Sequence, residues 1–319
     1  MTPRVSLRPA RPGDLAACTR IWAAANADYY RRRLNRAWEP GELGPLQRFL
    51  AHLLSTDPAL FQVATRTGES GAEQVIGFGA ANERGPAWFL SMLFVRPDSQ
   101  AEGVGRMILE QILPGQVGHE TILGTATDSV QPISSALYGR YGMVPRLPAF
   151  QFVGRPVGSG RLPPLPEGIR VDPLDGGGPD GMGGAADGER AEAMDHVDRE
   201  VLGHLRPEDH RFLRQEGRLG FVYRSAEGHP LAYGYASPTG RLGPVAVVDV
   251  DLLAPVTAHL LESVVPPGES AVWLPGDAGA VYPILLGAGL RIEGFPALFC
   301  WNRPVADFSR YIPISLALV

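Results

Sequence analysis

One part of the chain changes from a strand pattern to a helix pattern across a short polar turn. Residues 88–95 hold seven apolar residues among eight, with aromatic and β-branched members, which favours a strand buried on both faces. Apolar residues then recur at helical spacing over residues 104–112. The turn between them contains Gln100, Gly103 and Gly105. This stretch is the part of the chain best suited to hold a ligand.

The rest of the first half follows the same two periods. Short or alternating apolar runs predict strands at residues 5–9, 61–65, 75–82 and 120–127. Helical spacing predicts a helix that begins at Asp14 and further helices at residues 44–54 and 131–141. Gly142 follows the last of these, as glycine does at many helix ends.

The two glycines of the turn suit an anion. Without a Cβ atom, Gly103 and Gly105 allow special φ values and a close approach of the backbone to a bulky ligand. The first N–H groups of a helix lack intrahelical partners, and the positive end of the helix dipole attracts phosphate. The pattern therefore predicts a pyrophosphate cradle. It is neither a lysine-bearing P-loop nor a dinucleotide-binding turn, because neither glycine motif occurs in the required place.

The turn resembles the acetyl-CoA signature of the GNAT superfamily of N-acetyltransferases, Q/R-x-x-G-x-G/A. Gln100, Gly103 and Gly105 occupy its fixed positions. Glu102 departs from the basic or neutral residue that the family often has, so its carboxylate should point away from the phosphates or weaken the site. Residues 7–14, L-R-x-A-x-x-x-D, are similar to the first strand and helix of GNAT domains.

Residues 131–143 resemble a second GNAT motif, N-x-x-A-x-x-x-Y-x-x-x-G-F. Its tyrosine and glycine correspond to Tyr138 and Gly142. Three of its other positions carry substitutes, namely Gln131, Ser134 and Met143. The motif follows the cradle in the order that the family has, with a predicted strand between the two. Together the two motifs identify residues 1–155 as a member of the family.

The chain starts over after a linker rich in proline and glycine at residues 156–168. Residues 147–156 align without a gap with residues 295–304, and both segments carry a Pro-Ala and an Arg-Pro pair. Residues 169–319 are therefore interpreted as a diverged copy of the first half. The resemblance implies an α/β (α+β) fold of two tandem GNAT-like domains, each a mixed, mostly antiparallel twisted sheet flanked by helices.

The copy has lost the ligand-binding features. Asp249 and Asp251 stand where a diphosphate would approach, and like charges disfavour binding there. The glycine-rich residues 176–188 fit a flexible loop better than a phosphate site, because no strand and helix frame them. We therefore expect one acetyl-CoA per chain, in the N-terminal domain.

The second half should still fold, with strands at residues 245–250 and 297–301. The apolar tail 311–319 should add a strand to a neighbouring sheet.

The resemblance assigns the steps of acetyl transfer to particular residues. Backbone N–H groups of Leu93, Phe94 and Val95 would bind pantetheine and polarise the thioester carbonyl. The diphosphate would be held by the backbone of Gln100, Ala101, Glu102, Gly103, Val104, Gly105 and Arg106, with Gln131 and Ser135 as further cofactor contacts. Tyr138 would donate its proton to the CoA thiolate, since the ordinary pKa of a phenol, ~10, lies near that of an alkyl thiol.

The base that removes the proton of the ammonium group is left open. Glu83, just after the predicted third strand, is the carboxylate nearest in sequence to the site, and Asp28, His52 and a water chain are alternatives. The arginine-rich segment 28–36 is either a solvated helix face or a lid that meets the acceptor, as the family's connection between its first two helices implies.

The function expected from these residues is acetyl-CoA-dependent N-acetyl transfer to a primary amine. Two alternatives are a catalytically silent sensor that binds acyl-CoA and an acyltransferase that uses a longer acyl-CoA. The acceptor, a small molecule or a peptide, is not specified, because acceptor pockets are built from variable loops.

Length, charge and cysteine content narrow the setting. The 319 residues suffice for two domains of ~150 residues each. A net charge of −5 does not suit nucleic acid, and Cys18 and Cys300 give no disulfide framework and fit a core instead. No apolar run reaches the ~18 residues of a membrane span. We expect a cytoplasmic monomer or homodimer with no metal, membrane or nucleic-acid partner.

Overall fold

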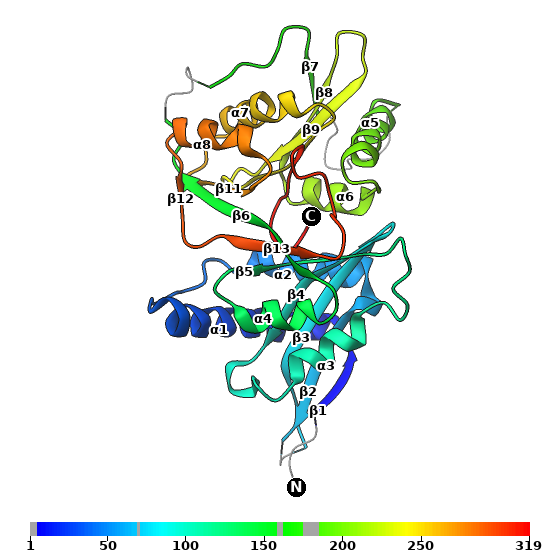
Figure 1. Ribbon diagram of the computed structural model, residues 1–319, viewed down its shortest axis with the longest axis vertical. Helices are drawn as coiled ribbons and strands as arrows, with labels where there is room; N and C mark the ends of the chain where they lie inside the picture. Colours follow the sequence, from blue (N-terminus) through cyan, green and yellow to red (C-terminus); the bar gives the residue numbers. More distant parts are fainter. Residues whose placement is uncertain (1–4, 69–70, 158–161, 175–184) are drawn as a thin grey trace. The chain divides into compact units, whose positions relative to one another are not determined.

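The computed structural model describes residues 5–68, 71–157, 162–174 and 185–319 (Figure 1). The chain folds into two compact units, residues 1–123 and 124–319. The linker expected at residues 156–168, of which 158–161 lie outside the described residues, falls within the second unit. The domain boundaries proposed from the sequence stay a prediction.

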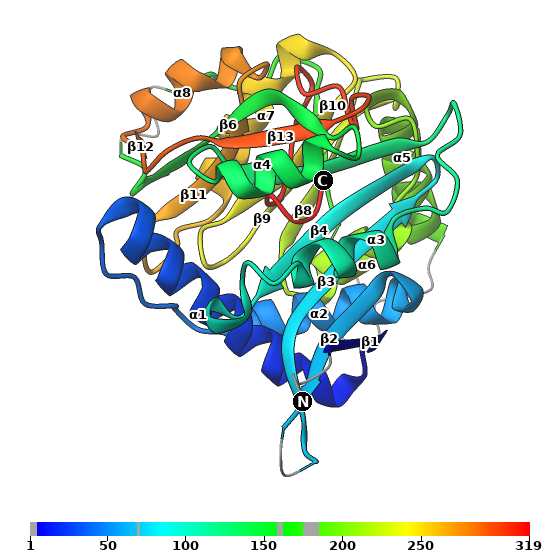
Figure 2. The same ribbon diagram turned by 60° about the horizontal axis from the view of Figure 1, so that its bottom comes forward.

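The first unit is an antiparallel sheet with helices on both faces. Its strands follow the order β1 (Val5–Pro9), β2 (Phe61–Thr67), β3 (Glu73–Arg84) and β4 (Ala87–Val95). The helices are α1 (Leu15–Leu34), α2 (Gly44–Thr56) and α3 (Val104–Ile112), with short 3-10 turns η1 (Pro12–Asp14), η2 (Pro58–Leu60) and η3 (Pro97–Ser99). Helix α1 packs against β3 and β4, and α3 packs against β2, β3 and β4 (Figure 2).

Side-chain alternation along β3 assigns these helices to opposite faces. Gly79 points at α3, because a Cβ atom there would lie 2.5 Å from Cγ2 of Ile108. Phe78 points to the other face, where its ring stacks on Phe94 at 5.8 Å between centroids. Phe94 in turn contacts Trp22 of α1 at 6.5 Å. Since successive side chains of a strand alternate in face, α1 and α3 cover opposite faces of the sheet.

The described residues form two sheets in all, and the second unit holds the remaining strands of the nine-stranded sheet as well as a five-stranded sheet. In the first, β13 (Ala297–Trp301) lies between β5 (Ile122–Asp128) and β6 (Val144–Gly154), and β11 (Ser270–Pro275) and β12 (Arg291–Ile292) pair with β6. The second sheet has the order β14 (Tyr311–Ile312), β10 (Leu242–Val247), β9 (Pro230–Ala236), β8 (Leu219–Arg224) and β7 (Arg170–Pro173).

The helices of the second unit are α4 (Pro132–Gly139), α5 (Ala185–Val201), α6 (Pro207–Gln215), α7 (Leu253–Ser263) and α8 (Tyr282–Gly287), with 3-10 turns η5 (Val250–Leu252) and η6 (Gly279–Val281). Both α5 and α7 pack against β9 and β10. The second sheet therefore buries its apolar positions beneath helices from the second half of the chain.

The two repeated segments, 147–156 and 295–304, pair with each other. The first lies in β6 and the second in β13, and the two strands run antiparallel with Ala149 opposite Ala297 (Figure 1). Strand β13, from the second half, separates β5 from β6, and β6 pairs with β11 of the second half. The two copies therefore exchange their repeated strands.

Gly234 supports the interpretation of the second half as a copy. This glycine stands 16 residues before Val250, as Gly79 stands 16 before Val95. It lies on β9, where a Cβ atom would be 2.5 Å from Cδ1 of Leu260 in α7. The close approach of strand and helix is the same as that of Gly79 and Ile108. Helix α7 is therefore the counterpart of α3.

Some bounds differ from those predicted. Helix α1 continues to Leu34 and ends at Asn35, whose φ is 48°, so the arginine-rich segment 28–36 is mostly the end of one long helix. Strand β10 ends at Val247, before the predicted residue 250. Helix α5 begins at Ala185, inside the predicted loop 176–188, and residues 176–184 of that loop lie outside the described residues.

Two other predictions are confirmed. The tail contributes β14, which pairs antiparallel with β10. Cys18 and Cys300 are buried free thiols, and burial raises the pKa of each to about 12, so they act as small core residues. Among the helices in the described ranges, none has the length and apolar character needed to cross a membrane.

Candidate active site

The turn before α3 has the backbone geometry of an anion site. Gly103 takes a φ of 80° as the N-cap of α3, and Ala101 takes a φ of 65°. Left-handed residues of this kind are a feature of backbone turns that bind anions. The first bond of the helix runs from the Met107 N–H to the Gly103 carbonyl at 3.0 Å. The N–H groups before Met107 therefore have no carbonyl within the helix to donate to, and they lie at its positive end.

Neither glycine is required by packing against side chains. A Cβ atom on Gly103 would meet no heavy atom within 4 Å, and one on Gly105 would lie 3.6 Å from Cγ2 of Val95, an ordinary contact. The space beside Gly103 is open for a ligand, and only its left-handed φ requires glycine for the chain's own sake.

Two side chains of the turn are held by the sheet. The Gln100 side-chain amide donates to the carbonyl of Val95 at 3.0 Å, which ties the turn to the end of β4. Glu102 forms an ion pair with Arg66 of β2. From the sequence, the Glu102 carboxylate was expected either to point away from the phosphates or to weaken the site. The ion pair draws the carboxylate toward β2 and balances its charge there.

Strand β4 bulges just before the residues expected to bind the thioester. Met92 lies opposite Ala80 and Leu90 opposite Ala81, so Ser91 is an extra residue. The Asn82 side chain donates to the Ser91 hydroxyl at 2.8 Å and fixes the bulge. Bulges of this kind interrupt regular pairing and redirect the strand.

Alternate N–H groups of β4 point toward β3 and away from it. The Arg96 N–H donates to Ile76 of β3 at 2.8 Å. Because alternate residues of an antiparallel strand direct their N–H groups to the same side, Phe94 also faces β3. Leu93 and Val95 then direct their N–H groups away from β3. Of the three residues predicted to contact pantetheine, these two have the suitable orientation.

Tyr138 lies on α4 of the second unit and is 6% exposed. Burial raises the pKa of its phenol above the ordinary value, and a hydrogen bond with the Ser134 side chain opposes this shift. Ser134 is the residue that replaces alanine in the second motif, so the substitution supplies a partner for the tyrosine. A raised pKa keeps the phenol protonated at neutral pH.

Gln131 and Ser135 share a face of α4 with Tyr138. Ser135 precedes it by one turn and Gln131, at the start of the helix, by two turns, at the spacing that aligns side chains along a helix. Gln131 is the N-cap, and its carbonyl accepts from the Ser135 N–H at 3.2 Å. The helix ends before Gly142, whose φ is 84°, and the predicted glycine stop is confirmed.

The candidate bases lie on three different elements. Glu83 is exposed at the end of β3, opposite Trp88, whereas the register places Val95 opposite Gly77 at the other end of the hairpin. Its backbone N–H donates to Asp57 at 3.0 Å. His52 is buried on α2, and Asp28 is buried on α1. The role of each stays a prediction.

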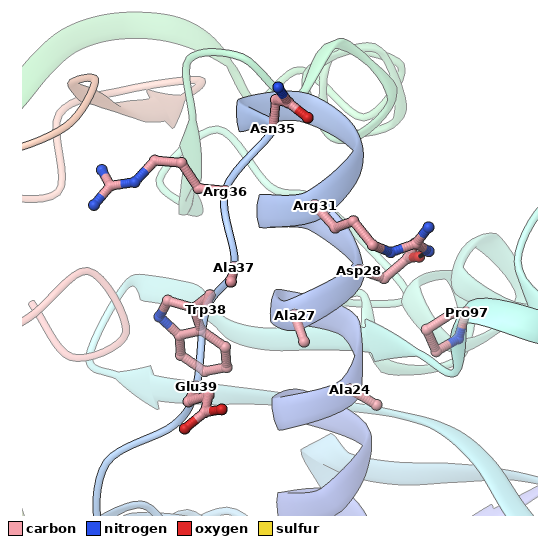
Figure 3. A pocket seen from close by; sticks show the side chains of 10 residues that line it. All are labelled: Ala24, Ala27, Asp28, Arg31, Asn35, Arg36, Ala37, Trp38, Glu39 and Pro97. Carbon is pink, nitrogen blue, oxygen red and sulfur yellow. Dashed lines mark hydrogen bonds and ion pairs between the residues drawn. The ribbon is translucent and has the colours of Figure 1, made fainter.

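A groove of about 590 Å³ opens in the first unit between the end of α1, the following loop and η3 (Figure 3). Ala24 and Ala27 of α1 line it beside Pro97. Trp38 also lines the groove, and its ring stacks on Tyr30 at 5.6 Å. Trp38 and Tyr30, which belong to no sequence motif, give the groove an aromatic wall.

The charged groups of the groove come from the same segment. Asp28 accepts hydrogen bonds from Arg31 and Arg32 of the next helical turn, the latter at 2.9 Å. Arg36 and Glu39 line the groove from the loop (Figure 3). The sequence allowed two interpretations of residues 28–36, a solvated helix face or a lid that meets the acceptor. Arg32 lies on the helix and does not line the groove, as the first interpretation expects, whereas Arg31 lines a space large enough for a ligand.

The corresponding turn of the second half is capped by its own side chain. Asp249 precedes η5, and its carboxylate accepts from the Asp251 N–H at 3.1 Å. An N-terminal N–H that would face a phosphate is therefore satisfied by a carboxylate of the chain. This contact supports the expectation that the second half lacks a cofactor site.

The second unit also holds a buried polar network that no sequence motif indicated. Arg206 donates to the hydroxyls of Tyr233 and Tyr311, and Tyr233 donates to Asp198 at 2.6 Å. His210 lies 3.0 Å from the second oxygen of Asp198. Burial alone would raise the pKa of Asp198, but Arg206 and His210 outweigh it and hold the pKa below its ordinary value.

These side chains are buried against one another, so they stabilise the second unit rather than offer a site. In the parts of the chain that the structure describes, no three His, Cys, Asp or Glu side chains gather in a way that could hold a metal ion.

Comparison with known proteins places this geometry in a fold family. No protein-family model and no curated protein matches the chain. A protein from Pyrococcus horikoshii, provisionally classed as an acetyltransferase, is 13% identical over 99% of this chain and 96% of its own, with a TM-score of 0.69. A GCN5-related N-acetyltransferase from Sphaerobacter thermophilus is 16% identical over 96% and 98%, with a TM-score of 0.58.

A tandem GNAT protein from the clavulanic acid biosynthesis pathway is 15% identical over 94% of this chain and 99% of its own, with a TM-score of 0.54. The fold is thus that of the GNAT acetyltransferases, as the sequence predicted. Its arrangement is the tandem one, with two GNAT-like copies in a single chain.

Proposed function

We propose that the chain is an acetyl-CoA-dependent N-acetyltransferase that acts on a primary amine. The observation that carries the proposal is the sequence of elements from β4 to α3, in which a bulged strand, a left-handed Gly103 and an open helix N-terminus follow one another. The likeness to GNAT acetyltransferases over nearly the full chain supports it.

In this proposal the backbone from Gln100 to Arg106 holds the diphosphate of acetyl-CoA. The N–H groups of Val104 and Gly105 belong to the first turn of α3 and can donate to phosphate oxygens. Arg66 supports the site indirectly, because its ion pair with Glu102 reduces the repulsion between that carboxylate and the diphosphate.

The chemical step is direct attack of the amine on the thioester. The amine nitrogen bonds to the carbonyl carbon, and the N–H groups of Leu93 and Val95 stabilise the negative charge that forms on the oxygen. The carbon–sulfur bond then breaks, and Tyr138 gives its phenolic proton to the departing thiolate. The nitrogen, positively charged after its attack, loses a proton to water to give the neutral amide, and the phenolate takes a proton back from water. Burial raises the pKa of Tyr138, which keeps the phenol protonated until the thiolate forms but moves its pKa away from that of an alkyl thiol, the match from which the role was first inferred.

The proton of the incoming ammonium must leave before the attack. Glu83 is the candidate named from the sequence, but its position opposite Trp88 lies several residues along β4 from Leu93. A chain of water molecules ending at Glu83 fits this placement better than direct contact.

A thiol-release assay with acetyl-CoA and a panel of primary amines tests the proposal. We expect CoA release that depends on the amine, and a lower rate of release in Gly103→Asp at low acetyl-CoA concentration. Acetyl-CoA binding without release for every amine would contradict the enzyme and favour the second candidate, a silent sensor of acyl-CoA. The observation that favours the sensor is the hydrogen bond of the buried Tyr138 with Ser134.

A further inference from the structure

We infer that the groove beside α1 binds an acceptor that carries a carboxylate as well as its amine, as a free amino acid does, and that it rejects polycations. The inference rests on the proposed acetyl transfer and names the substrate class. Its basis is the charge and the aromatic wall of the groove.

The groove lies next to the segment that leads to the cradle. Pro97, which lines it, starts η3 directly after β4 and leads into Gln100. Trp38 makes an edge contact with Trp22 at 5.5 Å, and Trp22 makes another with Phe94 of β4 at 6.5 Å. The wall of the groove is therefore packed, through one ring, onto the strand that would present the thioester.

The charged groups at the groove carry one more positive than negative charge. Arg31 and Arg36 line it together with Asp28 and Glu39. Arg32, which donates to Asp28, adds a third guanidinium group beside the groove. Asp28 already accepts from Arg31 and Arg32 through the same oxygen, Oδ1. Its negative charge is thus balanced, and a second or third ammonium group on an acceptor would meet arginine rather than carboxylate.

Arg36 and Glu39 stand on either side of Trp38 in the loop and line the groove. Within the described residues neither forms an ion pair. A guanidinium group matches a carboxylate with two parallel hydrogen bonds, and a carboxylate accepts from an ammonium group. The loop therefore offers one contact of each sign beside an indole face, which fits an amino acid lying against Trp38.

Kinetics with paired acceptors test this inference. Each of several L-amino acids is compared with its own carboxamide, and spermidine serves as the polycation, all as kcat/KM per neutral amine. We expect each acid to exceed its amide by about tenfold, the size expected for one charge-assisted hydrogen bond. The amine of the acid has the higher pKa and is the stronger nucleophile when neutral, so part of any preference for the acid is chemical; the part due to binding is the part that a change at Arg36 removes.

The variant Arg36→Gln should remove this preference by raising KM for the acids about tenfold while leaving the amides unchanged. Arg33→Gln is the matched control, since Arg33 is an exposed arginine of the same segment that does not line the groove. It should change neither class of acceptor.

The outcomes separate the inference from the function on which it rests. Equal or better use of the amides or of spermidine would overturn the inference and leave acetyl transfer standing. If no amine is acetylated, the proposed acetyl transfer is refuted. Calorimetric titration of the acids and amides into the protein then still tests whether the groove prefers a carboxylate. Acids that bind no more tightly than amides would then overturn it as well.

Discussion

Replacing Gly103 by aspartate or by asparagine separates the charge of the cradle from its shape. Gly103 has a φ of 80°, and a side chain there would meet no atom within 4 Å. Both variants should therefore fold, at a shared cost of about 1–2 kcal/mol for a left-handed residue. Asparagine and aspartate have nearly the same shape, so the difference between them is one negative charge.

That charge would lie beside the diphosphate of acetyl-CoA. Two like charges at about 5 Å repel by about 0.8 kcal/mol at the dielectric constant of water and by about 3 kcal/mol at the value near a protein surface. We expect Gly103→Asp to bind acetyl-CoA about 4- to 150-fold more weakly than Gly103→Asn. The gap should narrow as salt is added.

Isothermal titration calorimetry of the two folded variants, at low and at high salt, measures this difference. Circular dichroism checks that both retain the fold. Equal affinities of the aspartate and asparagine variants would refute the assignment of the diphosphate to this turn.

Three further predictions concern the acid, the buried network and the exchanged strand. Tyr138→Phe should leave acetyl-CoA affinity nearly unchanged and lower turnover by ~10²–10⁴-fold. If turnover, measured across the pH range, falls less than about threefold, another group is the acid. Asp198→Asn leaves Arg206 buried without its counter-charge and should cost about 3–5 kcal/mol in urea unfolding, so a loss under about 1 kcal/mol would show that the network does not stabilise the unit. Because the folded pKa of Asp198 lies below its unfolded value of ~4, its contribution is complete above pH ~4 and is lost as the pH falls through the folded pKa. A chain ending at residue 155 lacks β13 and β11 and should be insoluble or poorly folded by NMR, whereas a well-dispersed spectrum would contradict the strand exchange.

The local elements of the first unit could be predicted because their signals are local. The apolar run of residues 88–95, the left-handed Gly103 and the helical spacing after it each reflect a preference of a few neighbouring residues. The same holds for Gly142 at the end of α4. The tandem fold was predicted because two motifs and a repeat occur in one order.

Contacts between distant residues were not predicted. The partner of Glu102 is Arg66, on another strand, and no pattern around either residue indicates the pair. The repeat of 147–156 at 295–304 suggested two separate copies, but two similar strand sequences can pair with each other as well as within their own halves. The choice depends on the whole sheet and is not encoded within either segment.

The groove shows the same limit. The apolar residues at helical spacing extend only as far as Trp22 in the sequence. The arginines that follow fitted a solvated helix face and a lid equally well. The continuation of α1 to Leu34 depends on packing against β3 and β4, and it brings Arg31 and Trp38 to one space. A lone tryptophan in a polar loop was the signal that could have indicated a binding surface.

The central claim is that a chain with two GNAT-like copies has one cofactor site, at the cradle after β4. A calorimetric titration with acetyl-CoA measures this directly. We predict one site per chain in the native protein and in Asp251→Asn, with the affinity of that site lowered in Gly103→Asp. Two equivalent sites in the native protein, or one site that keeps the native affinity in Gly103→Asp, would contradict the claim.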